Sequence, residues 1–133
     1  MKIKNQLVLA LVSNGVLGIT ATTLNASQAY KIIKFRREVR NAFDEMSEKE
    51  KDYINALGLE IGENGKLEGK EDDIKKFGEF QKALYEDEVE LGDIKAMPYD
   101  AWHELQKENK ALAIPFIEDG LEGIIWTAPA PEE

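Results

Sequence analysis

The stretch from Ala26 to Leu57 contains neither glycine nor proline. Both residues interrupt helices, so a long segment that lacks them can remain helical without a break. Apolar residues recur in it at alternating spacings of three and four, which places them along one side of a helix. They are Ile32, Phe35, Val39, Ala42 and Met46, continued by Tyr53 and Ala56, with Lys49 as the exception. The pattern predicts one long helix with a heptad seam.

The residues at the ends of this stretch have the chemistry of helix caps. Asn25 or Ser27 can accept a hydrogen bond from an unpaired amide of the first turn, and Gly58 stands where a C-terminal cap is expected. A competing boundary lies inside the stretch, because Ser47 to Glu50 has the form of a capping box that could begin a new helix. A single long helix and a helical hairpin both fit the sequence, and we favour the long helix.

The first 29 residues have the outline of a secretory signal peptide. Lys2 and Lys4 form a basic start, Leu7 to Ile19 is largely apolar, and Ser27-Gln28-Ala29 offers a small-x-small cleavage site. In one interpretation the protein is exported and begins near Tyr30 after cleavage. In the other, these residues are retained and begin the fold.

We favour retention, because Ser13-Asn14-Gly15 interrupts the apolar run and Thr20 to Asn25 is polar. The same interruption leaves no apolar run of the length of a transmembrane helix, so no membrane contact is predicted. Gln6 to Leu17 is then expected to form a short, mostly buried helix. A strand is the competing assignment, since valine and isoleucine are frequent in the run.

A small β-hairpin is predicted over Leu59 to Leu67, where Asn64-Gly65 is the preferred residue pair of a type I′ turn. Asp72-Asp73 then begins a third helix, with its acids placed where the helix dipole favours them. The apolar stripe of that helix consists of Ile74, Phe77, Phe80 or Gln81, and Leu84.

Two further elements follow. Val89 to Leu91 alternates in polarity and predicts a short extended piece. Pro98 suits the first turn of a fourth helix, because its missing amide hydrogen is not needed there. That helix is expected to bury Tyr99, Trp102 and Leu105.

From residue 111 onward the chain is predicted to be extended, because glycine and proline recur too often for a helix. Its apolar residues are too many for a free, solvated tail, so they are expected to pack on this protein's own body or on a neighbouring molecule. They are Ile114, Phe116, Ile117, Ile124, Ile125 and Trp126.

The predicted fold is therefore mainly α with a small β-hairpin. It has a short N-terminal helix, a long central helix, two shorter helices and an extended C-terminal tail. Residues 1–110 are assigned to one mainly helical domain and residues 111–133 to an extended, apolar and proline-rich arm. The length of 133 residues suits one domain, and 43% hydrophobic with 32% charged residues is typical of a soluble globular protein. The absence of cysteine excludes disulfides, thiolate metal sites and a cysteine nucleophile.

Charge is distributed unevenly along the chain, whose formal net charge is −9. Residues 1–40 carry a net +6, and residues 41–133 carry −15. Such a split often supports partner contacts, or head-to-tail contacts between copies, by electrostatic complementarity. The alternative is that both faces are simply solvated, which is the more common outcome for a single charge run.

The densest basic cluster consists of Lys31, Lys34, Arg36, Arg37 and Arg40, which form a band on the long helix opposite its apolar seam. The band could contact an acidic partner or nucleic-acid phosphates. It could also be a solvated face whose charges pair with the acidic remainder of the same fold, which is the interpretation we favour. Nucleic acid is disfavoured, since the protein is acidic and no aromatic residues are interleaved for base stacking. These five residues remain the candidate contacts for a protein partner.

No pattern of reactive residues predicts an enzyme. The single histidine, His103, has no nucleophile or further metal ligand at a recognisable spacing, so it is assigned a structural role. Asp72-Asp73 and Asp87-Glu88 could pair as general acid and base, but 26 acidic residues make such a coincidence frequent. Phosphate-binding glycine loops, calcium loops and the nucleophile elbow of hydrolases are absent from the sequence. We predict a protein without catalytic activity, cofactor or metal.

The order of features resembles a family of small, uncharacterised proteins encoded by tailed bacteriophages and prophages. The resemblance covers residues 1–107. It rests on the Lys-Ile-Lys-Asn start, a short apolar helix, a long charged helix and an Asn-Gly loop, followed by Phe77 to Leu84 (FGEFQKAL) and Glu88 to Leu91 (EVEL). The chain departs from the pattern in its polar stretch Thr20 to Thr23. The resemblance implies a phage origin and a non-enzymatic role.

The leading hypothesis is a structural or assembly protein of a virion, made in the bacterial host cytoplasm and acting through contacts with other virion proteins or with itself. Its C-terminal arm would reach a neighbouring subunit, with Phe116, Ile125 and Trp126 as anchors. Deletion of residues 111–133 would then leave a folded protein that no longer assembles. One alternative is an acidic phage protein that inhibits a host nucleic-acid enzyme by imitating phosphate charge. Another is an exported protein from which residues 1–29 have been removed.

Overall fold

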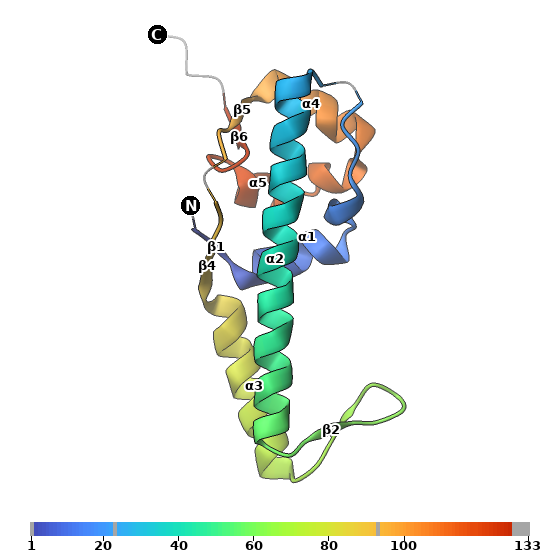
Figure 1. Ribbon diagram of the computed structural model, residues 1–133, viewed down its shortest axis with the longest axis vertical. Coiled ribbons are helices and arrows are strands. Elements are labelled where there is room, and N and C mark those ends of the chain that lie inside the picture. The colour runs from blue at the N-terminus through green and yellow to red at the C-terminus, as the bar shows by residue number, and fades with distance from the viewer. Residues whose placement is uncertain (1, 23, 93, 129–133) are drawn as a thin grey trace.

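A computed structural model describes residues 2–22, 24–92 and 94–128 of the chain (Figure 1). The fold is mainly α, with one long central helix and small two-stranded sheets. The elements in chain order are β1 (Lys2–Lys4), α1 (Asn5–Ser13), η1 (Val16–Gly18), α2 (Ala26–Ala56), β2 (Glu60–Ile61), β3 (Leu67–Glu68), α3 (Glu71–Glu86), β4 (Glu88–Glu90), β5 (Met97–Pro98), α4 (Tyr99–Glu108), η2 (Lys110–Ala113), α5 (Pro115–Leu121) and β6 (Trp126–Thr127).

Helix α2 runs the length of the molecule (Figure 1). It is continuous through Ser47, so the single long helix is confirmed and the helical hairpin is wrong. The Asn25 side chain accepts a hydrogen bond of 2.9 Å from the Gln28 amide and so caps the first turn. At the other end Gly58 adopts a φ of 69°, a left-handed conformation that glycine tolerates without strain.

One side of α2 faces the core, as its periodicity predicts. The residues of α2 that are buried are Ile32, Phe35, Val39, Ala42 and Met46. Beyond them the pattern weakens, because Tyr53 is only half-buried and Ala56 is exposed. The upper half of α2 in Figure 1 contacts α1 and η1 and lies in front of α4 and α5, whereas its lower half has α3 beside it. The core is therefore concentrated at the end that holds the N- and C-terminal elements.

The N-terminal segment is part of that core. Helix α1 is confirmed, and η1 follows it after a left-handed Gly15. Strand β1 pairs antiparallel with β4, with Ile3 opposite Val89. Six apolar side chains of the segment are buried: Ile3, Leu7, Val8, Leu11, Val16 and Ile19.

Polar contacts hold the connection between η1 and α2. The Thr20 hydroxyl donates to Glu108 Oε1 at 3.0 Å, and the Thr22 amide donates to Glu108 Oε2 at 3.0 Å. Asn109 completes the junction, because its side-chain nitrogen donates to the Thr20 carbonyl at 2.7 Å and its oxygen accepts from the Thr20 amide at 3.0 Å. The polar residues after η1 thus tie this connection to the end of α4.

Helix α3 lies beside the lower half of α2 and is joined to it by aromatic contacts (Figure 1). The Tyr53 ring stacks on Phe80 with centroids 4.1 Å apart and lies 6.3 Å from the ring of Phe77. The Tyr85 hydroxyl donates to Glu50 Oε1 at 3.0 Å and accepts from Gln81 Nε2 at 3.0 Å. These contacts compensate for the shorter apolar seam of this half.

The predicted β-hairpin is confirmed, with β2 and β3 antiparallel and Ile61 opposite Leu67. Its turn differs from the prediction, because Gly65 has a φ of 77° whereas Asn64 does not have a positive φ. The Gly62 amide donates to the Lys66 carbonyl at 2.7 Å, which leaves a three-residue loop with its last residue left-handed. The type I′ turn is therefore wrong, since that turn needs positive φ at two successive residues.

Helix α4 buries Trp102 and Leu105 and leaves Tyr99 half-buried, close to the prediction. The segment after it differs from the predicted extended arm, because η2, α5 and β6 fold back onto the helices. Strand β6 pairs parallel with β5, and the Trp126 ring stacks on Trp102 with centroids 6.1 Å apart. The buried side chains of residues 111–128 thus belong to the same core as those of α1, the first half of α2 and α4; residues 129–133 lie outside the described part of the chain.

The recurrence of proline and glycine predicts an extended segment, yet the segment contains helix α5. Pro115 occupies the first turn of α5, where its missing amide hydrogen costs no hydrogen bond. The helix then ends after Leu121, and Gly123 takes a φ of 79° in the turn that leads to β6. Glycine and proline here mark the boundaries of short elements, and burial of Leu112, Ile117, Leu121 and Ile125 stabilises them.

Tyr85 gives the lower half of the molecule a testable pH dependence. Burial, followed by the hydrogen bond to Glu50 and the charge of Glu50, raises the pKa of the Tyr85 hydroxyl above its ordinary value near 10. A raised folded-state pKa contributes stability below pH 10 that is lost as the pH rises through the folded value. The free energy of unfolding is therefore expected to fall at alkaline pH.

Tyr85→Phe isolates this contribution. The variant should lose about 0.5–1.5 kcal/mol of stability at pH 8, the usual net value of one hydrogen bond. The difference between wild type and variant should shrink between pH 8 and pH 11. Urea unfolding at both pH values measures it, and a difference that is constant or grows with pH would contradict the assignment.

Candidate functional site

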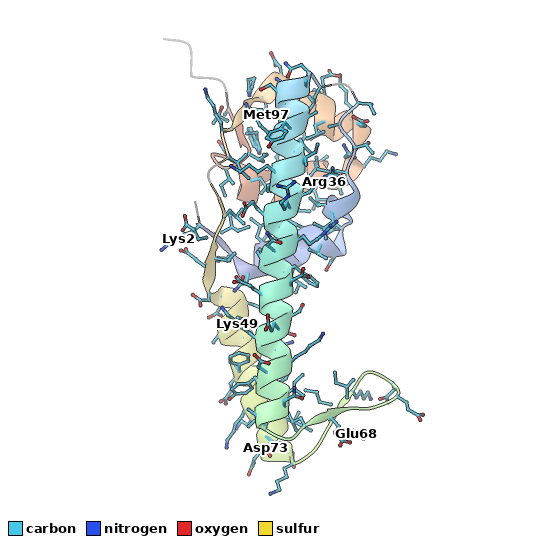
Figure 2. The ribbon with its side chains drawn as sticks, in the orientation of Figure 1. Lys2, Arg36, Lys49, Glu68, Asp73 and Met97 are labelled. Carbon is cyan, nitrogen blue, oxygen red and sulfur yellow. The ribbon has the colours of Figure 1, made fainter. Side chains whose placement is uncertain are left out.

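The candidate partner-binding surface lies on the upper half of α2, where Figure 2 labels Arg36. We call it the basic face; it consists of Arg36, Arg37 and Arg40, which line a hollow of about 200 Å³ together with Leu17 of η1 and Ile33. Helical geometry explains the grouping, because residues 33 and 37, and residues 36 and 40, are each one turn apart. Of the predicted basic cluster, Lys31 and Lys34 do not line this hollow.

The three arginines of the basic face have different roles. Arg36 is half-buried, and its Nη1 donates to the Ile19 carbonyl at 3.1 Å, which ties α2 to the end of η1. Its Nε is buried and has no hydrogen-bond partner within residues 2–22, 24–92 and 94–128. Arg37 and Arg40 are exposed. Arg36 therefore holds the end of η1 against α2 at the edge of the hollow, whereas Arg37 and Arg40 are accessible to a partner.

Two large apolar side chains are exposed beside these arginines. Tyr30 is 68% exposed and Ile33 is 44% exposed. Both lie on the side of α2 that faces away from the core; Tyr30 is two turns before Arg37 and Ile33 is one turn before it. Exposed aromatic and branched aliphatic side chains next to arginine are typical of protein interfaces. The periodicity that identified the core seam did not single out these two residues.

The C-terminal candidates do not form one surface. Phe116 is 52% exposed and borders a hollow of about 260 Å³ that Lys2, Leu7 and Ile124 also line. Ile125 is fully buried and Trp126 is 5% exposed, both within the core of this chain. The expectation that Ile125 and Trp126 anchor a neighbouring subunit is therefore wrong. These two side chains pack on the protein's own body, which is one of the two alternatives that the sequence left open.

A second hollow on α2, of about 440 Å³, is lined mainly by carboxylates and was not predicted. Four of its five carboxylates come from α2 at spacings of six, one and three, and the fifth comes from Glu90 of β4. The residues are Glu38, Asn41, Ala42, Asp44, Glu45, Glu48, Val89 and Glu90. The spacing was visible in the sequence, but the position of β4 depends on its pairing with β1.

The residues considered for catalysis do not assemble. His103 is exposed on α4 and stacks on Tyr99 with ring centroids 5.7 Å apart. Asp72 and Asp73 lie in the first turn of α3, whereas Asp87 and Glu88 lie at its other end, so the two carboxylate pairs cannot act on one substrate group. Among residues 2–22, 24–92 and 94–128, no group of three His, Asp or Glu side chains could hold a metal ion.

Comparison of the chain with protein-family models, with curated proteins and with solved structures found no match. Within the described part of the chain, no helix combines the length and the apolar character needed to cross a bilayer.

Proposed function

We propose that this protein has no catalytic activity and acts by binding other proteins, as a structural or assembly component of a tailed-phage particle. The binding surface is the basic face, extended by the apolar side chains of Tyr30 and Ile33. The observation that carries the proposal is the exposure of these two side chains beside Arg37 and Arg40 on one side of a long helix. The phage setting rests on the resemblance in residues 1–107.

The physical argument is one of contact energy. Isolated exposed apolar residues are common on protein surfaces, but two that are one helical turn apart, beside arginine, form a contiguous patch. Tyrosine and arginine are the residues that most often dominate interface energy, because they bury large areas while keeping a polar group. The exposed arginines would favour a partner with acidic residues around an apolar contact.

Incorporation into particles tests the proposal. Tyr30→Ala combined with Ile33→Ala should reduce the amount of this protein in purified particles about tenfold, since truncation of interface anchors commonly costs that much binding. Quantitative mass spectrometry of particles grown with each variant measures it. Ile61→Ala is the matched control, because this side chain is 63% exposed and apolar but lies on β2, beyond the C-terminal end of α2.

Absence of the wild-type protein from purified particles would overturn the particle assignment. If the protein were instead recovered with a host nucleic-acid enzyme, and salt released it, the acidic inhibitor would replace the leading hypothesis. If Ile61→Ala lowered incorporation as much as the double variant, the basic face would not be the binding surface.

A further inference from the structure

The outward side of α2 has a repeating order of its own, opposite the core seam. Spacings of three and four bring Tyr30, Ile33, Arg37, Arg40, Asp44 and Glu48 to this side. All six are exposed, and in Figure 1 α2 lies in front of the other elements. A helix side with such spacing is able to pack lengthwise against another helix.

Charge on this side changes sign along the helix. The arginines Arg37 and Arg40 come first, and the carboxylates of Asp44 and Glu48 follow within the next two to three turns. A second helix that has the same order and lies level with the first is complementary to it only if it runs in the opposite direction. The surface is therefore complementary to itself under a two-fold rotation.

We propose that the partner of the basic face is a second copy of this chain, which packs its α2 antiparallel against the first. The proposal deepens the proposed function, since it rests on the outward side of α2 being a protein-binding surface. The two-fold axis crosses the helix pair at the level of Ala42. A residue of one helix therefore lies opposite the residue of the other helix whose number brings the sum of the two to 84 or 85. Arg40 of each copy then faces Asp44 of the other, and Arg37 faces Glu48.

The charges also exclude the neighbouring registers. A shift of one heptad in one direction would place Arg37 of one copy against Arg40 of the other. A shift in the opposite direction would place Asp44 against Glu48. Both bring like charges together, whereas the proposed register pairs opposite charges in each of these positions. The same side chains therefore select one alignment.

The pairing is expected to be modest in strength and sensitive to salt, because exposed ion pairs contribute little each and are screened. The two-fold symmetry doubles every contact, which gives the dimer two Arg37–Glu48 and two Arg40–Asp44 pairs. Ile33 lies near the ends of this contact and adds apolar area. Low ionic strength is therefore the condition under which to look for the dimer.

Charge reversal at one pair tests the proposal by sedimentation velocity of the full chain over a range of concentrations. Arg37→Glu and Glu48→Arg should each weaken self-association about tenfold, since each replaces two attractive pairs by two repulsive ones. The double variant restores opposite charges and should recover the wild-type dissociation constant within about threefold. Positions 37 and 48 are too far apart along one helix to contact each other, so recovery would report contact between copies.

Matched controls are available on α3, where Lys76 and Glu79 are exposed. Lys76→Glu and Glu79→Arg change the net charge as the two single variants do and should leave self-association unchanged. The double variant R37E/E48R keeps the net charge of −9, so its behaviour cannot be attributed to total charge. At concentrations where every variant is monomeric, circular dichroism and thermal unfolding should be unaffected, because the altered side chains are exposed.

The proposal is overturned if the wild-type chain remains monomeric at low ionic strength, if either single reversal leaves the dimer intact, or if the double variant fails to recover. Its failure is separable from that of the proposed function. A monomeric protein that still requires Tyr30 and Ile33 for incorporation into particles has a different partner on this face. A dimer that follows the charge-reversal pattern but never enters particles supports the pairing and contradicts the particle assignment.

Discussion

A chain that ends at Lys110 should fail to fold. It lacks five side chains that are buried in the core: Leu112, Ile117, Leu121, Ile125 and Trp126. Each buried side chain of this size contributes about 1.5–3 kcal/mol, so their combined loss is comparable with the roughly 5–15 kcal/mol that stabilises a whole domain. The truncated chain should show no cooperative unfolding transition, as measured by circular dichroism during urea titration.

The opposite outcome is expected if residues 111–133 form an extended arm that packs on a neighbouring molecule. Deletion of such an arm would leave residues 1–110 folded. In the structure, Trp126 instead stacks on Trp102 of α4, whose side chain is 1% exposed. A truncated chain with a wild-type transition midpoint would contradict the packing of residues 111–128.

Two adjacent residues of α5 provide a finer test of the same packing. Ile117 is fully buried, whereas Phe116 is 52% exposed. Ile117→Ala should cost about 2–5 kcal/mol, since it removes buried methyl groups and leaves a cavity. Phe116→Ala should change stability by less than about 0.5 kcal/mol, as is usual for exposed positions. Equal effects of the two substitutions would show that α5 does not pack as described.

A chain that begins at Tyr30 should also be unfolded, because six buried apolar side chains of residues 2–22 are then absent. Their removal exposes the side of α2 that carries Ile32 and Phe35, and it removes β1, the partner of β4. The expected loss again matches the stability of a domain. Urea titration followed by circular dichroism should show residual helix in α2 but no cooperative transition.

Single substitutions in α1 test the packing of this helix without shortening the chain. Leu11 is fully buried, and Leu11→Ala should destabilise the protein by about 2–5 kcal/mol. Gln6→Ala, at an exposed position of the same helix, should be nearly neutral. A folded, cooperative protein that lacks residues 1–29 would contradict the role of α1 in the core.

The candidate site was only partly predictable. Residue spacing on a single helix is enough to bring Arg36, Arg37 and Arg40 within about one turn of each other. It does not show that these three residues line a hollow and that Lys31 and Lys34 do not, since Leu17 and the Ile19 carbonyl come from a different element. Exposure of Tyr30 and Ile33 could not be predicted either, because whether a helix side is covered depends on the position of every other helix.

The sequence by itself determined the elements whose signals are local. The buried seam of α2 and its end at Gly58 follow from interactions within a few residues of one another, and the same local signals limited its cap to Asn25 or Ser27. The structure decided between these two caps and shows that α2 is continuous through Ser47. The tertiary structure alone decided the conformation and burial of residues 111–128 and the pairing of β1 with β4. These segments are too short to be stable in isolation, so their conformation depends on burial against residues far away in the chain.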